Sequence, residues 1–475
     1  MDIKYYENEK NEKQKKRETV KEGFFPEINA QCRTEKRNGL YLPDDFPNIK
    51  RPKARGGNAG SKIVRPEPLS EGDKVALISP SFYTSRKKLE DAVRSVEMLD
   101  LEPVVFPSCI NKYDYLAGDD SLRAEDLMRA FSDPSIRAVF CLRGGYGAAR
   151  ILDLIDYKII RKNPKAFIGF SDITALHTAI NQRCGLITYH GPMPTAPYHS
   201  MDKEISLSSL KKCLFGKESE YEVQLKEMKI LNEGNRKRKE NIDRTTGQAP
   251  IPDAASDRKQ KRAGALSEQA DTLSEQTGAL SARTGTLSEQ ADALSALAGT
   301  LSEQAGSLPA RAGALMCGRL CGGNLTVLAA ALGTPYEIET AGKILFLEDV
   351  GERTYRIDRA VSSLRLAGRL RACSGILLGT FEGCTPEPGG RTCEQIIKEI
   401  AEPLGIPVLS GLPCGHSKPN MTLPFGAWCE IWPQYPSEYH PENSDIPVHT
   451  SGKADKTEKN VEPETAILRI KFKTE

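Results

Sequence analysis

The feature that most constrains the fold of this chain is a repeated alternation between short apolar runs and segments with helical periodicity. Runs such as Val75–Ile78 and Ile136–Leu142 have the length of buried strands. Segments such as Arg86–Leu99 carry their apolar side chains on one side, as an amphipathic helix does. Strands that alternate with helices are typical of a parallel sheet covered on both faces. We therefore expect an α/β fold with functional groups at the carboxyl ends of its strands.

One junction between a strand and a helix, Lys165–Ile180, contains a serine in a notable place. The apolar run Ala166–Phe170 has the length of a buried strand, and apolar residues then recur with helical spacing as far as Ile180. Ser171 lies at the turn between the two. A serine in such a turn is either the N-cap of the helix or a nucleophile. The local pattern favours the cap, and both interpretations remain open at this point.

The charge and cysteine content restrict the partners and the compartment. The 66 basic and 64 acidic residues give a net charge of +2, which offers no reason to expect nucleic acid or an anionic membrane as the partner. The sequence contains neither an apolar run long enough for a transmembrane helix nor an N-terminal run typical of a signal peptide. The 12 cysteines include no Cys-x-x-Cys pair. We therefore expect reduced core cysteines in a cytoplasmic protein.

The polar parts of the chain are expected to lie outside the packed domains. Only 39% of the residues are hydrophobic and the mean hydropathy is −0.45. We interpret residues 1–69 as a disordered charged extension, 216–315 as a mostly flexible insertion and 433–463 as a second low-complexity insertion. This interpretation leaves an N-terminal domain at 70–215 and a C-terminal domain at 316–475.

The longer insertion contains a strand-like run, Tyr221–Leu225, and a seven-residue repeat whose leucines recur from Leu266 to Leu315 without a slip. A coiled coil with leucine at the d positions is one interpretation of the repeat. The glycines within the repeat each cost roughly 1 kcal/mol in a helix, and alanine at the a positions buries little area. We favour a flexible, repeat-expanded insertion that takes no part in catalysis.

Three of the six histidines are candidates for a role in a site. His416 lies in a glycine-containing loop after a strand, which is the best place for a general base. We expect His177 to pack or to be solvated, and His190 to support a pocket. The histidines show none of the spacings of a metal site, so we expect no metal.

A carboxylate at a strand end is the natural partner for such a base. Glu348 follows the apolar run Ile344–Leu347, and a carboxylate in this position can orient an imidazole at the same sheet edge. An exposed strand end is the alternative interpretation of Glu348. Asp349 and Glu352 are alternative partners that the strand pattern does not exclude.

The glycine-rich turn Arg143–Gly147 does not fit a dinucleotide site. Arg150 stands where the third glycine of that motif belongs. Glycines here are better suited to bring backbone N–H groups close to a substrate oxyanion. Ile173 likewise stands at the second glycine of the Gly-x-Ser-x-Gly motif, so ordinary α/β-hydrolase membership is not indicated.

Several segments, which occur in one order across 72–215 and 316–432, resemble the LD-carboxypeptidases. These serine peptidases are also called muramoyltetrapeptide carboxypeptidases. The matching segments are Ala76–Ser81, Leu142–Arg150, Gly169–Thr174, Tyr189–Met193, Leu320–Leu325, Leu347–Glu352, Tyr355–Arg359 and Gly411–His416.

The resemblance implies two domains and a catalytic triad assembled at their junction. It implies an N-terminal parallel-sheet α/β domain of the flavodoxin or Rossmann-like type and a C-terminal β-rich α/β domain. Ser171 matches the nucleophile, Glu348 the charge-relay acid and His416 the general base.

The resemblance also implies the groups that bind substrate. The oxyanion hole would consist of the backbone N–H of Asp172 and that of Gly144 or Gly145. Recognition of the terminal carboxylate of the substrate needs a cation or a helix N-terminus, and Arg143 and Arg359 are both candidate cations.

The activity that the resemblance implies is the release of terminal D-alanine from peptidoglycan tetrapeptides during cell-wall recycling. The enzyme would cut an L-to-D bond as a cytoplasmic homodimer without a cofactor. Three alternatives remain: a microcin C immunity peptidase of the same family, a non-catalytic scaffold protein that uses the repeat, and a cysteine hydrolase. The nucleophile of the last would be Cys141 or Cys414.

Overall fold

The computed structural model describes residues 63–225, 228–232, 314–434 and 465–472, which form two compact units. The first unit extends to Gly216 and includes two short later segments, Gly333–Glu337 and Met421–Leu423. The second unit contains the remaining described residues from Lys217 onwards. The predicted coiled coil or flexible repeat lies outside the described residues, except for its last leucine. So do residues 1–62 of the predicted extension and residues 435–464 of the second insertion.

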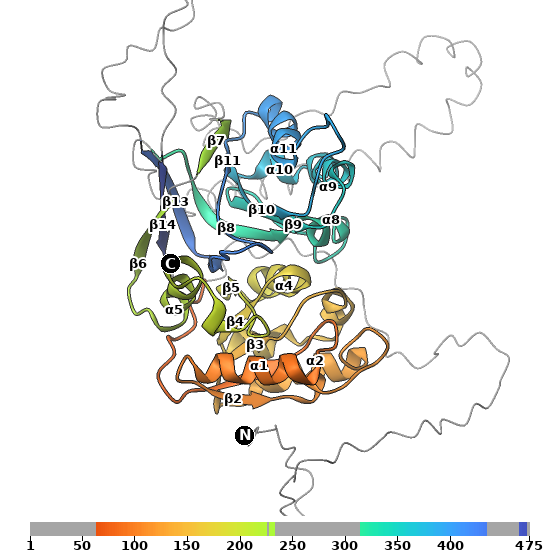
Figure 1. Cartoon of the computed structure of the whole chain (residues 1–475), viewed down its shortest axis with the longest axis vertical. Helices are drawn as coiled ribbons and strands as arrows, with labels where there is room; N and C mark the ends of the chain where they lie inside the picture. The colour runs from red at the N-terminus through yellow and green to blue at the C-terminus, as the bar shows by residue number, and fades with distance from the viewer. Residues whose placement is uncertain (1–62, 226–227, 233–313, 435–464, 473–475) are drawn as a thin grey trace, which may run out of the picture. The chain divides into compact units, whose positions relative to one another are not determined.

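The first unit is built around a sheet with the strand order β12-β5-β4-β3-β1-β2 (Figure 1). The pairings of β1 with β2 and β3, of β3 with β4 and of β4 with β5 are parallel. The order β2-β1-β3-β4-β5 is that of flavodoxin-like sheets, in which ligands bind where the order reverses, between β1 and β3. The strands are β1 (Lys74–Ile78), β2 (Glu102–Val105), β3 (Ile136–Cys141), β4 (Ala166–Gly169), β5 (Thr188–His190) and β12 (Leu423–Phe425).

The helices of this unit follow the apolar periodicity of the sequence. In α1, Leu89, Val93 and Val96 are buried on one face, and the Ser85 side chain accepts from the N–H of Lys88 at the helix start. The helix predicted at 86–99 is confirmed, with its end two residues earlier, at Glu97. The helices are α1 (Arg86–Glu97), α2 (Asp120–Ser132), α3 (Tyr157–Lys162), α4 (Thr174–Cys184) and α5 (Ser208–Phe215).

The second unit contains a larger mixed sheet with the order β6-β14-β13-β8-β9-β10-β11-β7. Strands β8, β9, β10 and β11 pair in parallel, and antiparallel pairings add the other strands on either side. This sheet confirms the predicted β-rich α/β domain. The strands are β6 (Glu220–Leu225), β7 (Lys229–Asn232), β8 (Met316–Asn324), β9 (Ile344–Val350), β10 (Gly375–Glu382), β11 (Val408–Ser410), β13 (Trp428–Gln434) and β14 (Thr465–Lys471).

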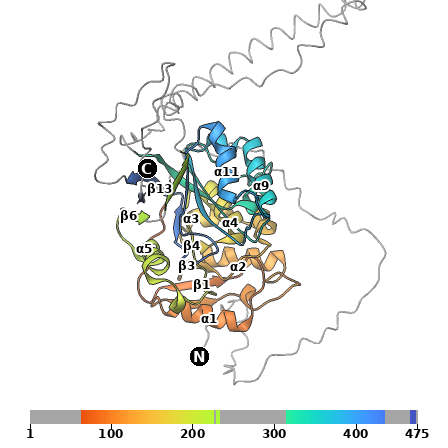
Figure 2. The same ribbon diagram turned by 45° about the horizontal axis from the view of Figure 1, so that its top comes forward.

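Helices α8 (Leu325–Ala330), α9 (Thr354–Leu366) and α11 (Cys393–Ala401) share one hydrophobic cluster with β9 and β10. Figure 2 shows α9 and α11 side by side in this unit. Helix α9 ends at Leu366, and Gly368 follows with a left-handed φ of 78°. A separate short helix, α10 (Arg369–Ala372), follows it.

Two boundaries drawn from the sequence are wrong. The end of the predicted extension is ordered, since Val64 bridges to Leu186 and Leu69 is buried. The start of the predicted insertion belongs to the second sheet, where β6 pairs with β14 and β7 with β11. Sheet edges supply backbone partners to segments whose own composition is polar, so composition alone placed these segments outside the domains. The strand-like run at Tyr221–Leu225 itself is confirmed as β6. Pro433 likewise lies in β13 rather than in the second insertion.

The glycine-rich segment Gly318–Asn324 belongs to strand β8. Its glycines hide the strand pattern but permit close backbone packing. A Cβ atom at Gly322 would lie 1.9 Å from the carbonyl oxygen of Phe346 on β9. Leu315, the last leucine of the repeat, is buried next to β8, and its N–H donates to the Ile431 carbonyl. None of the helices in the described ranges combines the length and the apolar composition that a membrane span requires.

Candidate functional site

Ser171 occupies a strained turn between β4 and α4. Its φ is 65°, in the left-handed region that residues other than glycine rarely adopt. The side chain caps neither the short 3₁₀ helix Ser171–Ile173 nor α4, whose N-caps are Phe170 and Ile173 without side-chain hydrogen bonds. The N-cap interpretation is therefore wrong. A strained serine at a strand-to-helix turn is the geometry that exposes a nucleophilic hydroxyl.

The glycine-rich turn after β3 lies against Ser171. A Cβ atom at Gly144 would be 2.8 Å from Ser171 Cβ, 2.9 Å from Ser171 Oγ and 3.1 Å from the backbone nitrogen of Asp172. Gly145 has a φ of 108°, and a Cβ atom there would be 2.5 Å from the ring of Phe82. Only glycine allows this approach, so the backbone of the turn borders the serine hydroxyl and the Asp172 N–H.

Replacing Gly144 with alanine is predicted to impair catalysis more than folding. The added methyl group must displace Ser171, and a displacement of about 1 Å in a catalytic group can cost roughly 10²-fold in rate. We expect kcat to fall by about that factor while KM changes little, as measured by steady-state peptide hydrolysis. Gly72→Ala is the control for an added methyl group away from the site: a Cβ atom there would have no neighbour within 4 Å, and the φ of 79° makes this alanine lower stability without touching Ser171. Equal kcat values for the two variants would contradict the prediction.

The side chain of Asp172 ties the serine turn to two other loops. Its Oδ2 accepts hydrogen bonds from the Ser81 hydroxyl at 2.6 Å and from the Ala148 N–H at 2.8 Å. The residue is 4% exposed, and burial raises the pKa of its carboxyl group while these two hydrogen bonds oppose the rise. The loops after β1, β3 and β4 are therefore held together at the sheet edge where the strand order reverses.

The sequence analysis assigned no role to Arg123, whose guanidinium binds the loops after β1 and β3. This fully buried residue of α2 donates from Nη1 to the carbonyl oxygens of Pro80 at 2.6 Å and Gly147 at 2.8 Å. It also pairs with Asp120, which in turn pairs with Arg150. The signal in the sequence that could have identified Arg123 was a single arginine among the apolar side chains of α2, because a charged group in such a position requires buried partners.

Glu348 and His416 form a hydrogen-bonded pair in the second unit. Glu348 ends the apolar part of β9 and is fully buried, and its Oε2 lies 2.7 Å from Nδ1 of His416. Burial raises the pKa of Glu348, and the hydrogen bond from His416 opposes the rise. A Cβ atom at Gly415 would lie 3.0 Å from the same Oε2, so glycine lets the loop bring His416 against the carboxylate. The other ring nitrogen of His416, Nε2, is turned away from this bond.

The two alternative acids have other partners. Asp349 accepts from Asn324 Nδ2 at 3.1 Å and from both the N–H and the hydroxyl of Thr326, at the start of α8. Glu352 forms an ion pair with Arg356 on α9. Glu348 is thus the acid that contacts the imidazole.

The two candidate cations differ in their surroundings. Arg143 is half-buried next to Gly144 in the first unit. Its Nη1 donates to the Tyr83 carbonyl at 3.3 Å, and its guanidinium lies 5.5 Å from the centre of the Phe82 ring. Arg359 is exposed on α9 of the second unit. Arg143 borders the serine turn of its own unit, because it directly precedes Gly144.

His177 is a buried packing residue, which is one of the two environments predicted for it. Its Nε2–H donates to the Gly169 carbonyl at 2.8 Å, and its ring packs against Phe167. His190 is also fully buried and contacts the ring of Phe170, next to Ser171. Both imidazoles thus support the serine turn from within the core.

The burial of His177 predicts a pH-dependent stability. Burial lowers the pKa of His177 from 6.5 to about 4. Because the folded state holds the ring neutral, the stability associated with neutral His177 is fully present above pH 6.5 and is lost as the pH falls towards 4. We expect the free energy of unfolding to drop by about 3 kcal/mol over this range.

The His177→Gln variant provides the test, because glutamine keeps an N–H donor but does not titrate. Urea unfolding from pH 7.5 to 4.5 should show a smaller drop in the free energy of unfolding for this variant than for the wild type. Parallel curves for both proteins would contradict this.

The cysteine-hydrolase alternative finds no support. Cys141 and Cys414 are both fully buried, and burial raises the pKa of each thiol well above its usual value, which disfavours the nucleophilic thiolate. In the described ranges, no group of three or more histidine, cysteine, aspartate and glutamate side chains is arranged to hold a metal ion.

Comparison with known proteins identifies relatives of both units. The family model of the LD-carboxypeptidase N-terminal domain matches residues 75–191, and that of the LD-carboxypeptidase C-terminal domain matches residues 317–431. A probable murein peptide carboxypeptidase of Bacillus subtilis is 32% identical over 365 residues, which cover 76% of this chain and 90% of the relative. A murein tetrapeptide carboxypeptidase of Pseudomonas aeruginosa is 29% identical, with coverage of 74% and 91%.

The similarity also extends to a protein with a different name and to a solved structure. The microcin C7 self-immunity protein of Escherichia coli is 26% identical, over 76% of this chain and 90% of that protein. The crystal structure of muramoyltetrapeptide carboxypeptidase from Oxalobacter formigenes shares the fold. Its TM-score is 0.54 at 21% identity, and the match covers 84% of this chain and 98% of that one.

Proposed function

This chain belongs to the LD-carboxypeptidase family of peptidases, and from that premise we propose that it is a serine carboxypeptidase that releases terminal D-alanine from peptidoglycan-derived tetrapeptides. The observation that carries the proposal is the 2.7 Å hydrogen bond between buried Glu348 and His416. A carboxylate that holds an imidazole in this way prepares a general base. The strained turn of Ser171 supplies a hydroxyl of the kind that such a base activates.

In the proposed mechanism, Ser171, His416 and Glu348 act as one triad. Nε2 of His416 takes the proton of the Ser171 hydroxyl as the oxygen attacks the carbonyl carbon of the L-to-D bond. The same imidazole then donates that proton to the amine of the leaving D-alanine, and water later hydrolyses the acyl-enzyme. Glu348 accepts the Nδ1–H, which fixes the tautomer and stabilises the imidazolium.

The tetrahedral oxyanion would be stabilised by backbone N–H groups. We assign this role to the N–H of Asp172 and to that of Gly144 or Gly145, because the glycine turn approaches Ser171 and the Asp172 nitrogen closely. Each such donor is worth roughly 3 kcal/mol in the transition state. The hydrogen bonds that tie the Asp172 carboxylate to Ser81 and Ala148 would keep these donors in place.

Arg143 is our choice for the cation that binds the terminal carboxylate of the substrate. It directly precedes Gly144, and its guanidinium is oriented by the Tyr83 carbonyl and the Phe82 ring. Such a group recognises a carboxylate through parallel N–H donors. Arg359, the other candidate, is exposed on α9 of the second unit. The family resemblance further supports a role in cell-wall recycling, in the cytoplasm, as a homodimer.

The test is hydrolysis of a muramoyl tetrapeptide by the purified full-length chain. Release of D-alanine, detected by chiral chromatography, is the expected result. A tetrapeptide that ends in L-alanine tests the L-to-D preference, and a pentapeptide that ends in D-alanyl-D-alanine tests for a DD-carboxypeptidase. Failure to release D-alanine from the tetrapeptide, or faster release from the pentapeptide, would contradict the proposal.

A second candidate function, peptidase immunity to microcin C, is supported by the similarity to the self-immunity protein. Expression of the chain in microcin C7-sensitive cells distinguishes the two: protection would favour immunity, and unchanged sensitivity together with D-alanine release would favour recycling. For the scaffold alternative, the repeat on which it depends lies outside the described residues. Membership in a peptidase family argues against it.

A further inference from the structure

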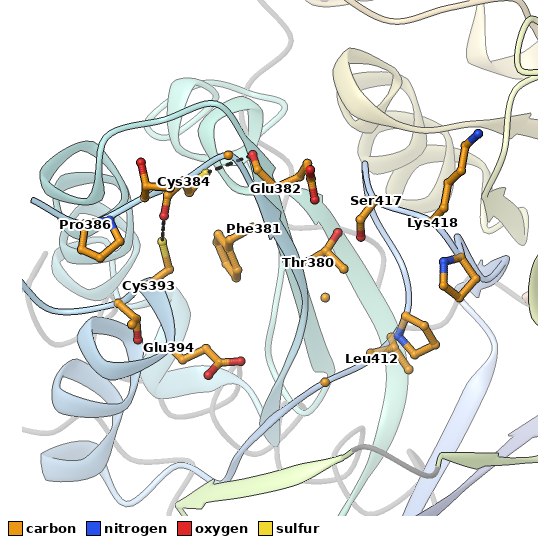
Figure 3. A pocket seen from close by; sticks show the side chains of 17 residues that line it. Thr380, Phe381, Glu382, Cys384, Pro386, Cys393, Glu394, Leu412, Ser417 and Lys418 are labelled. Carbon is orange, nitrogen blue, oxygen red and sulfur yellow. Dashed lines mark hydrogen bonds between the residues drawn. The ribbon is translucent and has the colours of Figure 1, made fainter.

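A cavity of about 530 Å³ lies in the second unit, between the carboxyl end of β10 and the loop that carries His416 (Figure 3). Its volume is within the range of roughly 300–1,000 Å³ that is usual for small-ligand sites. None of the catalytic roles described above uses it. Four segments form its walls: Gly379–Pro386, Thr392–Glu394, Gly411–Pro413 and Ser417–Pro419.

The cavity adjoins the loop that holds His416 against Glu348. Thr380 lines the cavity, and its N–H donates to the Cys414 carbonyl at 2.9 Å. A Cβ atom at Gly415 would lie 2.5 Å from Thr380 Oγ1 on one side and 3.0 Å from Glu348 Oε2 on the other. On the other wall, Ser417 directly follows His416 in the chain. A ligand in the cavity would therefore lie beside the general base.

The charges around the cavity favour a cation. Glu382 and Glu394 contribute two carboxylates, against one ammonium group from Lys418. Within the described ranges, neither glutamate side chain takes part in an ion pair or a side-chain hydrogen bond, whereas Arg391 near the same helix end pairs with Glu399. Figure 3 shows the Glu394 carboxylate directed towards the interior of the cavity and Lys418 on the opposite side.

The remaining walls suit an aliphatic chain. Phe381, Leu412 and Pro413 are among the residues that line the cavity, and they add apolar surface to its walls. A ligand with a flexible methylene stem and a terminal ammonium group would match both the apolar walls and the Glu394 carboxylate.

This charge balance distinguishes the two sides of the scissile bond. The leaving D-alanine carries a carboxylate, which the excess negative charge of the cavity disfavours. The residue before the bond, the third of the tetrapeptide, is lysine or diaminopimelate, and both side chains end in a primary ammonium group. We propose that the cavity receives the side chain of this third residue and that Glu394 pairs with its ammonium group. The inference rests on the proposed function, since that function places this residue next to His416.

The experiment compares three tetrapeptides that differ only at the third residue: lysine, diaminopimelate and uncharged norleucine. For the wild-type chain we expect kcat/KM to be roughly fivefold higher with an ammonium group than with norleucine, the size of a partly exposed ion pair. Glu394→Gln should remove this preference through KM and leave kcat unchanged. Glu402→Gln, a charge change at the other end of α11 and outside the cavity walls, should keep the preference. Melting temperatures verify that both variants fold.

A second pair of measurements identifies the side chain and separates the two proposals. Lys418→Met should lower kcat/KM only for the diaminopimelate peptide if the additional carboxylate of that side chain contacts Lys418. An equal effect on both charged peptides would show that Lys418 does not recognise this carboxylate and that the ammonium group common to both side chains is sufficient.

Calorimetric measurement of peptide binding to the Ser171→Ala variant tests the cavity without turnover. If the peptides bind with the lysine preference but the wild-type chain cleaves none of them, the proposed function fails and the cavity assignment stands. Equal binding of lysine and norleucine peptides, or an equal loss on all peptides in Glu394→Gln, would overturn the inference.

Discussion

Ser171→Ala is expected to lower the kcat for D-alanine release by a factor of at least about 10⁴ while the chain remains folded. Loss of the nucleophile removes the covalent step, and only binding and oxyanion stabilisation remain to accelerate the reaction. Because Ser171 makes no capping hydrogen bond to either helix that follows it, its hydroxyl contributes little to the fold. The measurement is single-turnover hydrolysis of the muramoyl tetrapeptide, together with thermal unfolding. A variant with more than about 10% of wild-type kcat would contradict the assignment of the nucleophile.

The strain at Ser171 provides a control that separates stability from catalysis. Its φ of 65° costs a residue other than glycine roughly 1–2 kcal/mol. Ser171→Gly relieves this cost, against a loss of roughly 0.5–1 kcal/mol in chain entropy. We therefore expect the glycine variant to be at least as stable as the alanine variant, and equally inactive. An alanine variant clearly more stable than the glycine variant in urea unfolding would argue against a strained turn.

Glu348→Gln is expected to lower kcat by roughly 10³–10⁴ with little change in KM. The carboxylate accepts the Nδ1–H of His416 at 2.7 Å, and an amide in its place can stabilise the wrong tautomer of the imidazole without moving the ring. The transition state also loses the negative charge that stabilises the imidazolium. Steady-state kinetics at neutral pH measure the effect. A decrease of less than about tenfold would indicate that Glu348 serves only the fold.

The adjacent residue provides the matched control. Asp349 holds the start of α8 through Asn324 and Thr326. Asp349→Asn removes a charge one residue away from Glu348 and weakens the hydrogen bonds to α8. We expect it to lower the free energy of unfolding by about 1–2 kcal/mol and to leave kcat within about twofold of the wild type. A large loss of kcat with unchanged stability would indicate that Asp349, and not Glu348, is the catalytic acid.

The elements of both sheets could be predicted where burial imposes a clear period on the sequence. The runs at Val75 and Ile136 and the amphipathic segment from Arg86 fold as their patterns indicate. The strand-like run at Tyr221 is confirmed as β6, but its place in the second sheet was missed, because its pairing partner β14 lies far away in the sequence, with Tyr221 opposite Ile470. Local composition carries no information on such partners.

The candidate site shows the same limit at the level of single side chains. The sequence placed Ser171 in a turn and assigned glycines to the loop at Gly144, but its pattern favoured a helix cap. The backbone angle of Ser171 and the contact with Gly144 are properties of the folded turn, so they could not be seen in the residue order. Arg123 was overlooked because its role depends on hydrogen bonds to three carbonyl oxygens from separate loops.

The sequence by itself determined the alternation of strands and helices, the residue types available at each strand end, and therefore the short set of acids able to serve His416. Only the tertiary structure decided among them. Consecutive residues of a strand point to opposite faces of the sheet, so Glu348 and Asp349 must face different neighbours. Which face meets the His416 loop and which meets α8 depends on the packing of elements that are distant in the chain, since His416 follows Glu348 by 68 residues. The pairing of Glu348 with His416 is thus a property of the fold.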